Sequence, residues 1–270
     1  MFGKLMKYEL RSCMRVFLPL WAATLALALI NGFTMGFEPA VSTPLLKFIL
    51  TILPGFLLFA LSLGMFVVAF VLIIRRFYSG LLGEGGPLAF TLPVTFAEQI
   101  NCRLLTALIM VVGCLLTGFL STVLIILIRG YGDTVQSFFA EARRVSASYP
   151  KTGLILFELI VFFLASGAYI VLRLYSAIAI GHLVQTHRGL CSLAAYIGIG
   201  WIINFILFGI GRLFNRYMET NPLVISVSSF EEALQYLPAF FGIGIGFSLL
   251  GCVVLWLLTW GILKKRLNIL

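Results

Sequence analysis

The chain alternates between long apolar runs and short polar connections, and six of the runs are long enough to cross a membrane as helices. A helix needs about 20 apolar residues to span a hydrocarbon core of about 30 Å. The runs cover approximately Val16–Met35, Phe48–Ile74, Leu104–Ile128, Leu154–Ala179, Ser192–Ile210 and Ala239–Leu263. We therefore expect an all-α integral membrane protein whose six transmembrane helices form a single domain over residues 1–270.

Residues 1–15 precede the first run and have an amphipathic pattern. At 100° per residue, four cationic side chains fall within an arc about 80° wide, and apolar residues occupy the other side. The four are Lys4, Lys7, Arg11 and Arg15. The pattern predicts a helix in the membrane interface, with its basic face toward anionic lipid headgroups. Glu9 projects from the apolar side and is either a carboxylate that reaches the surface or a contact with a basic partner protein.

Composition and charge agree with a membrane protein and predict its orientation. The chain is 61% hydrophobic and 11% charged, whereas soluble domains have about a quarter charged residues. With the N-terminus inside, eleven of the 19 Lys and Arg residues lie on the inner side and seven outside, with Arg173 unassigned. Because cytoplasmic connections are the cation-rich ones, both termini are expected in the cytoplasm. The net charge of +9 then reflects a membrane surface and requires no nucleic acid.

Sequence motifs for catalysis, nucleotide binding or metal binding are absent. There is no GxxxxGK[ST] loop, no HExxH and no GxSxG. His182 and His187 lie about 140° apart on a helix, so we expect solvated loop residues and not metal ligands. Asn31 and Asn204 are expected to make interhelical hydrogen bonds. Glu158 either faces a cavity or pairs near the outer surface. Without a catalytic cluster or an intramembrane proton relay, a transport component driven by another subunit is expected, not an enzyme.

The connection over residues 75–103 is the most distinctive part of the chain and includes FYSGLLGEGGPLAFTLPVTFAEQI from Phe77 to Ile100. It predicts a short helix over Phe77–Leu82, a break at the glycines and an extended piece between Pro87 and Pro93. Thr95 and Glu98 form a capping box that starts the helix of the third run. The segment is either an ordinary ordered loop or a cytoplasmic element that docks on a soluble partner. The residues expected to make that contact are Phe77, Tyr78, Leu81, Leu82, Gly83, Glu84, Gly85 and Gly86.

Three segments carry a family resemblance. KYELR at Lys7–Arg11, the stretch Phe77–Ile100, and YSAIAIGHLVQTHRG at Tyr175–Gly189 occur in this order. Together they resemble the small six-span permeases of bacterial ABC exporters, the second exporter family, in their Firmicutes members. The resemblance covers essentially the whole chain. It implies an N-terminal interfacial helix, a cytoplasmic coupling helix between spans two and three, and an outer re-entrant element within the external segment 212–238, for which Asn221–Pro238 is the candidate.

The resemblance also implies a function. It is that of a permease subunit in a bacterial cytoplasmic membrane, exporting a peptide, lipid or drug-like substrate. Such permeases pair as homo- or heterodimers and bind separately encoded ATPase subunits that carry ATP and Mg²⁺, so no cofactor is expected in this chain. Membrane lipids are the other expected partner. Two alternatives stay open: a non-transporting scaffold or sensor with the same fold, and an intramembrane enzyme, for which only Glu158 is available.

Overall fold

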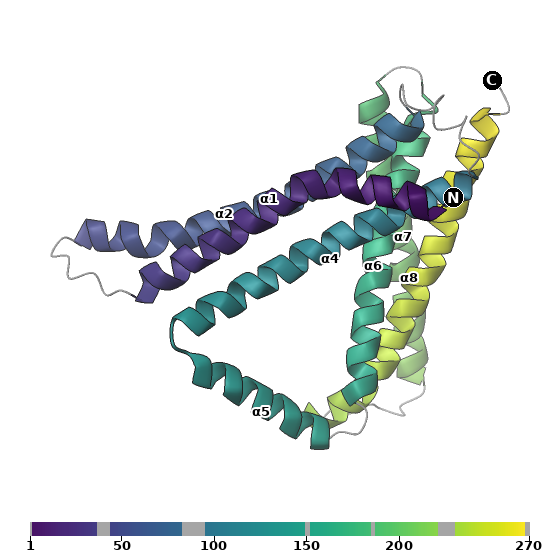
Figure 1. Cartoon of the computed structure of the whole chain (residues 1–270). Helices are drawn as coiled ribbons and strands as arrows, with labels where there is room; N and C mark the ends of the chain where they lie inside the picture. Colours follow the sequence, from purple (N-terminus) through teal and green to yellow (C-terminus); the bar gives the residue numbers. More distant parts are fainter. Residues whose placement is uncertain are drawn as a thin grey trace. The chain divides into compact units, whose positions relative to one another are not determined.

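The structure is a computed structural model that describes residues 2–36, 44–82, 95–148, 152–184, 187–220 and 230–267. Within these ranges it contains seven α-helices, one π-helical turn and no strands (Figure 1). Six helices are long and apolar enough to cross a membrane, and each predicted span lies on one of them. The expectation of an all-α chain with six helices able to span a membrane is confirmed over the described residues, as for a multi-pass membrane protein.

The chain divides into two compact units. Unit 1 comprises Met1–Arg76 and Glu98–Thr152, and unit 2 comprises Phe77–Ala97 and Gly153–Leu270. The chain therefore passes from unit 1 to unit 2 directly after Arg76 and returns directly before Glu98. The connection between the second and third spans belongs to unit 2, although both spans belong to unit 1.

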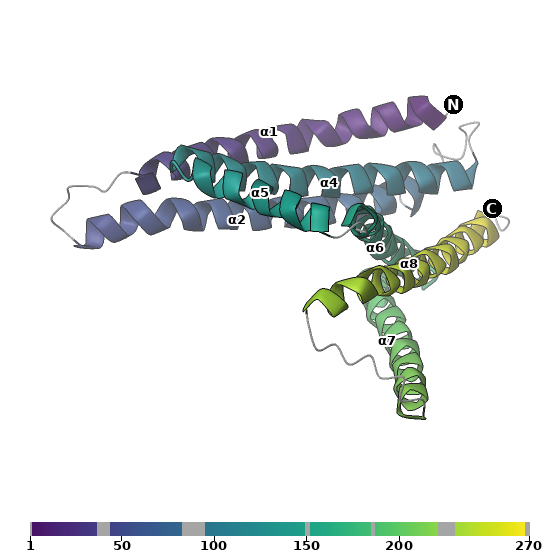
Figure 2. The same ribbon diagram turned by 90° about the horizontal axis from the view of Figure 1, so that it is seen from below.

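Unit 1 contains α1 (Phe2–Gly36), α2 (Pro44–Phe77, of which Phe77 falls in unit 2), α4 (Phe96–Ile128) and α5 (Gly132–Ser148). The first three run side by side (Figures 1 and 2). They bury a cluster between them that consists of Cys13, Phe17, Met65, Ala69, Met110 and Cys114. Trp21 packs at the edge of this cluster against Gly113, where a Cβ would overlap the indole ring. A small residue at this position therefore allows α1 and α4 to approach closely.

α1 is one continuous helix, so residues 1–15 do not form a separate element. The predicted basic face is exposed at Lys4, Lys7, Arg11 and Arg15. The opposite face packs on α2 and α4 through Cys13 and Phe17. The location of this segment at a membrane surface stays a prediction.

α4 begins where the sequence predicted, and it is followed by a helix that the sequence analysis missed. Phe96 is the first helical residue and Glu98 lies in the first turn, as the capping box requires. After α4 the chain turns at Gly130, whose φ of 74° glycine adopts without strain. α5 then starts at Gly132 and exposes the aromatic rings of Phe138 and Phe139.

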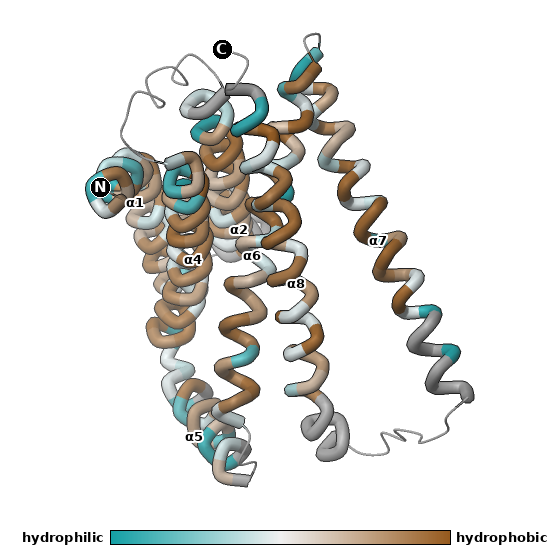
Figure 3. The backbone as a smooth tube through the Cα atoms, turned by 90° about the vertical axis from the view of Figure 1, so that its right-hand side faces the viewer, coloured by the Kyte–Doolittle hydropathy of each residue, from teal (hydrophilic) through white to brown (hydrophobic). Residues whose placement is uncertain are grey.

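Unit 2 contains η1, a π-helical turn (Tyr78–Leu82), and the helices α6 (Thr152–Gly181), α7 (Arg188–Thr220) and α8 (Phe230–Leu267). Apolar residues predominate along these three helices (Figure 3). The segment 212–238, which the sequence predicted to be external, forms the end of α7 and the start of α8 over its described residues. Residues 221–229 of the re-entrant candidate lie outside the described residues, and Phe230–Pro238 are continuous with α8.

Candidate functional site

A carboxylate in α1 holds two arginines that flank the connection between the second and third spans. Arg76 Nη1 donates to Glu9 Oε2 at 2.6 Å, and Arg103 Nε lies 3.9 Å from Glu9 Oε1. Arg76 also donates to the Glu9 carbonyl oxygen at 3.1 Å and to Ser12 Oγ at 2.7 Å. Arg103 donates to the Arg76 carbonyl oxygen at 3.1 Å. We call these four residues the Glu9 cluster.

The positions of these residues explain why the Glu9 cluster forms. Arg76 lies in the last turn of α2, where a cation interacts favourably with the helix dipole. Arg103 lies two turns into α4, and Glu9 reaches both from α1. The basic partners of the Glu9 carboxylate therefore belong to the same chain. The sequence had suggested either a carboxylate that reaches the surface or a contact with another protein. The contacts place the N-terminal part of α1, the end of α2 and the start of α4 at the same end of unit 1.

The residues that follow Arg76 pack within unit 2. Phe77 is fully buried and stacks on Tyr175, with ring centroids 4.1 Å apart. Tyr78 is 41% exposed and meets the buried His182 edge-on, at 5.4 Å between ring centroids. His182 is therefore a packing residue and not the solvated loop residue that we expected, whereas His187 is exposed.

The eight residues predicted to contact a partner thus divide into four groups. Phe77 is buried inside the chain and offers no surface to a partner, whereas Tyr78 does. Leu81 and Leu82 form the end of η1, which continues directly from α2 in place of a separate short helix. Outside the described residues lie Gly83, Glu84, Gly85 and Gly86, together with the predicted extended piece.

The three polar residues predicted inside the spans lie on different helices. Asn31 is buried in α1, and its Oδ1 has no hydrogen-bond partner in the described part of the chain. Glu158, in the first two turns of α6, has a buried Oε2 that likewise has no partner there. Asn204 is exposed on α7. The predicted interhelical hydrogen bond is not found for Asn31 Oδ1.

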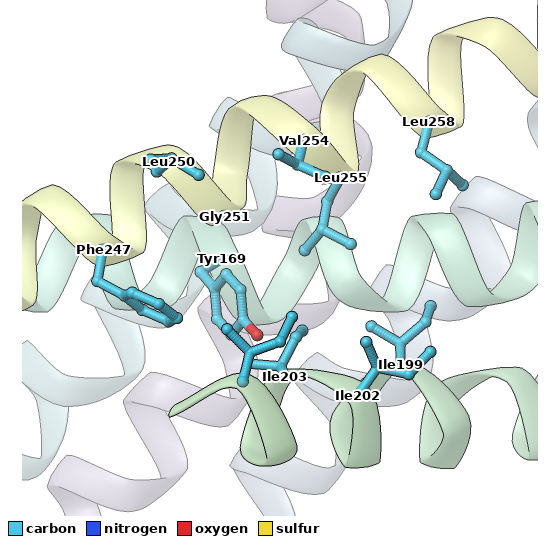
Figure 4. A pocket seen from close by; sticks show the side chains of 11 residues that line it. Tyr169, Ile199, Ile202, Ile203, Phe247, Leu250, Gly251, Val254, Leu255 and Leu258 are labelled. Atoms are coloured by element: carbon cyan, nitrogen blue, oxygen red, sulfur yellow. The ribbon is translucent and has the colours of Figure 1, made fainter. Parts of the chain in front are cut away.

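A cleft lies between α6, α7 and α8 within unit 2 and has an apolar and a polar part. The residues that line the apolar part are drawn in Figure 4. The apolar part has a volume of about 300 Å³ and is lined by aliphatic side chains of α7 and α8, by Phe247 and by Tyr169. The polar part, of about 230 Å³, shares Tyr169 and Phe247 and adds Arg173, Asn204 and Ser248. Figure 4 shows the Tyr169 ring projecting from α6 between the side chains of α7 and α8.

Arg173 is the charged residue of the cleft. Its Nη2 donates to the Tyr196 carbonyl oxygen at 3.0 Å, and its Cζ lies 4.2 Å from the centroid of the Tyr196 ring. Its Nε is buried without a hydrogen-bond partner, and no carboxylate pairs with it among the residues that the structure describes. Gly200 provides the space for the guanidinium, because a Cβ there would overlap it. Hydropathy could not reveal this arrangement, since its residues come from three helices.

Across the described ranges, no group of three or more His, Cys, Asp or Glu residues could hold a metal ion. The five cysteines are free thiols, and Cys13, Cys102 and Cys114 are buried. Comparison with known proteins found no matching family model, no matching curated protein and no matching solved structure.

Proposed function

We propose that this chain is the permease subunit of an ATP-driven exporter of the ABC class, located in a bacterial cytoplasmic membrane with both termini inside. The observation that carries the proposal is the position of the connection after the second span. Arg76, directly before the connection, is held in unit 1 by the Glu9 cluster. The first residues of the connection, Phe77 and Tyr78, pack in unit 2. A displacement of this connection by a partner therefore acts on both units, and relative movement of such units is a common basis of transport.

The energy for that displacement has to come from another protein. The sequence has no phosphate-binding loop, so ATP and Mg²⁺ are assigned to a separately encoded ATPase. Each ATPase docks on the cytoplasmic connection, where Tyr78 offers an exposed aromatic ring. The resemblance of the sequence to exporter permeases supports the same assignment. A second permease, identical or related, completes the transporter, and the substrate belongs to the peptides, lipids or drug-like molecules.

A pair of tyrosine variants tests this docking. Tyr78→Ala should lower the amount of ATPase that co-purifies with the chain by about tenfold or more, because buried aromatic contacts dominate interfaces at upward of ~2 kcal/mol. Tyr131→Ala removes a similarly exposed ring from the turn before α5 and should leave the ATPase bound. Deleting Gly83–Gly86 should abolish assembly while the chain still inserts into the membrane. Retention of the ATPase by both the deletion and Tyr78→Ala would refute the docking role.

A further inference from the structure

We propose that the cleft between α6, α7 and α8 binds an anionic lipid. The phosphate of the lipid lies at Arg173, and one acyl chain occupies the apolar part of the cleft. The role of this site, holding a lipid substrate during export, rests on the proposed function. Lipid binding itself does not, because it needs neither an ATPase nor transport.

The charge of Arg173 lies far from the nearer end of its helix. Arg173 precedes the end of α6 at Gly181 by eight residues, or about 12 Å at ~1.5 Å per residue. Gly200, which borders the guanidinium, follows the start of α7 at Arg188 by twelve residues, or about 18 Å on the same rise. Helical side chains point toward the N-terminus of their helix, so Arg173 reaches away from the nearer end of α6. The guanidinium therefore lies deep within the span.

Arg173 has no counter-charge among the described residues. A cation inside a membrane is costly and usually has a partner. The described contacts of Arg173 are a carbonyl oxygen and an aromatic face, and its buried Nε has no acceptor in the described ranges. A phosphate in the cleft provides the missing counter-charge, since guanidinium binds phosphate through charge-assisted hydrogen bonds. Asn204 and Ser248 line the same part of the cleft and supply further donors.

The apolar part of the cleft has the length and the lining that suit an acyl chain. It follows α8 from Phe247 to Leu258, which corresponds to about 16 Å of helix. This is about half of a ~30 Å hydrocarbon core, and therefore about the reach of one acyl chain in a leaflet. A volume of about 300 Å³ is also within the range of small-molecule pockets. The polar part lies at the Phe247 end, away from the C-terminal end of α8. A bound lipid thus has its headgroup drawn into the membrane, as lipid export requires.

Fluorescence anisotropy of the purified full-length chain in a neutral detergent tests the proposal. The probe is a phosphatidylglycerol with one fluorescent acyl chain, compared with a phosphatidylcholine that carries the same chain. We expect the anionic probe to bind about tenfold more tightly, the difference that one charge-assisted hydrogen bond makes. Soluble glycerol phosphate should not compete at the concentrations that displace the probe with unlabelled phosphatidylglycerol, because it lacks the acyl chain.

Two variants and two matched controls locate the effect. Arg173→Gln removes the charge, and Gly200→Ala displaces the guanidinium through the far end of a flexible side chain. Both should reduce the preference for the anionic probe to less than about twofold, the loss expected when the charge-assisted hydrogen bond is removed. Gly198→Ala adds a Cβ to the same helix where nothing lies within 4 Å, and Arg212→Gln removes an arginine that packs on Phe208 outside the cleft. Both controls should keep the preference.

The outcomes separate this site from the proposed function. Equal binding of the two probes by the wild-type chain, retention of the preference in Arg173→Gln, or competition by glycerol phosphate alone would each overturn the site. If the wild-type chain prefers the anionic probe and Arg173→Gln abolishes this preference, the lipid site is supported even when no ATPase co-purifies. The absence of an ATPase would then remove only the exporter role. An ATPase complex whose permease shows no lipid preference would leave the proposed function intact and remove the site.

Discussion

Replacing Glu9 by glutamine should destabilise the chain by about 1–2 kcal/mol, a value between those of exposed ion pairs and of hydrogen bonds to buried charges. The substitution keeps the size of the side chain and one acceptor oxygen but removes the charge that faces Arg76 and Arg103. The side chains of Arg76, Glu9 and Arg103 are only 24%, 23% and 11% exposed. An exposed pair contributes about 0–1 kcal/mol, whereas a hydrogen bond to a charged group contributes about 1.5–3 kcal/mol.

The loss of stability is smaller than for a buried charge left without any partner, because each arginine retains other hydrogen-bond acceptors. Arg76 keeps the Glu9 carbonyl oxygen and Ser12 Oγ, and Arg103 keeps the Arg76 carbonyl oxygen. Thermal unfolding of the purified chain measures the effect. At about 2–4 °C per kcal/mol for chains somewhat shorter than this one, Glu9→Gln should lower the Tm by about 2–8 °C. Glu141→Gln is the control, since Glu141 and Arg144 form an exposed pair at 3.5 Å.

A double-mutant cycle isolates the contact between Glu9 and Arg76. The single variants Glu9→Gln and Arg76→Gln should together cost more than the double variant, with a coupling energy of about 1 kcal/mol, as for other residues in direct contact. If the single effects simply add, or if Glu9→Gln unfolds at the same temperature as Glu141→Gln, the ion pair contributes nothing to stability. The Glu9 cluster would then be no anchor for the connection that follows Arg76.

Three further predictions concern packing and topology. Phe77→Ala should cost about 3–5 kcal/mol in thermal unfolding, because it empties a fully buried ring position. A wild-type Tm would contradict the stacking of Phe77 on Tyr175. Gly181→Ala should sharply reduce the yield of folded protein, since a Cβ there would overlap the Ser192 backbone. The control Gly189→Ala, where nothing lies within 4 Å of the added Cβ, should leave the yield unchanged. Similar yields for the two variants would count against the α6–α7 contact. A reporter fused to the C-terminus should be active in the cytoplasm and one inserted after Ile128 should be active outside, and an external C-terminus would invert the topology.

Features that depend on local sequence were predictable. The six spans followed from apolar run length alone, and the start of α4 followed from the spacing of Thr95 and Glu98. α5 carries a readable signal as well, because Val135, Phe138, Phe139 and Ala142 recur at helical spacing. A search for runs of about 20 apolar residues misses such a helix, since its polar face lowers the average hydropathy.

The features that carry the functional proposals depend on contacts between distant residues. Glu9 and Arg76 are 67 positions apart, and the sequence showed only that Glu9 interrupts an apolar face. The burial of Phe77 against Tyr175 is equally non-local, so the sequence favoured Phe77 as a partner contact. The cleft needs Arg173 and Gly200 to meet across two helices. Periodicity reveals which face of a helix is apolar but not which neighbour that face meets.

The most direct test of the central claim is purification of the full-length chain from its native membranes in mild detergent. Mass spectrometry identifies the proteins that accompany it, and ATP hydrolysis is measured on the eluted sample. We expect a P-loop ATPase in an amount equal to that of the chain, with ATP hydrolysis that is lost when Tyr78→Ala releases the ATPase. A chain that purifies as a stable, folded protein without any ATPase, and without ATP hydrolysis, would contradict the assignment as an ABC exporter permease.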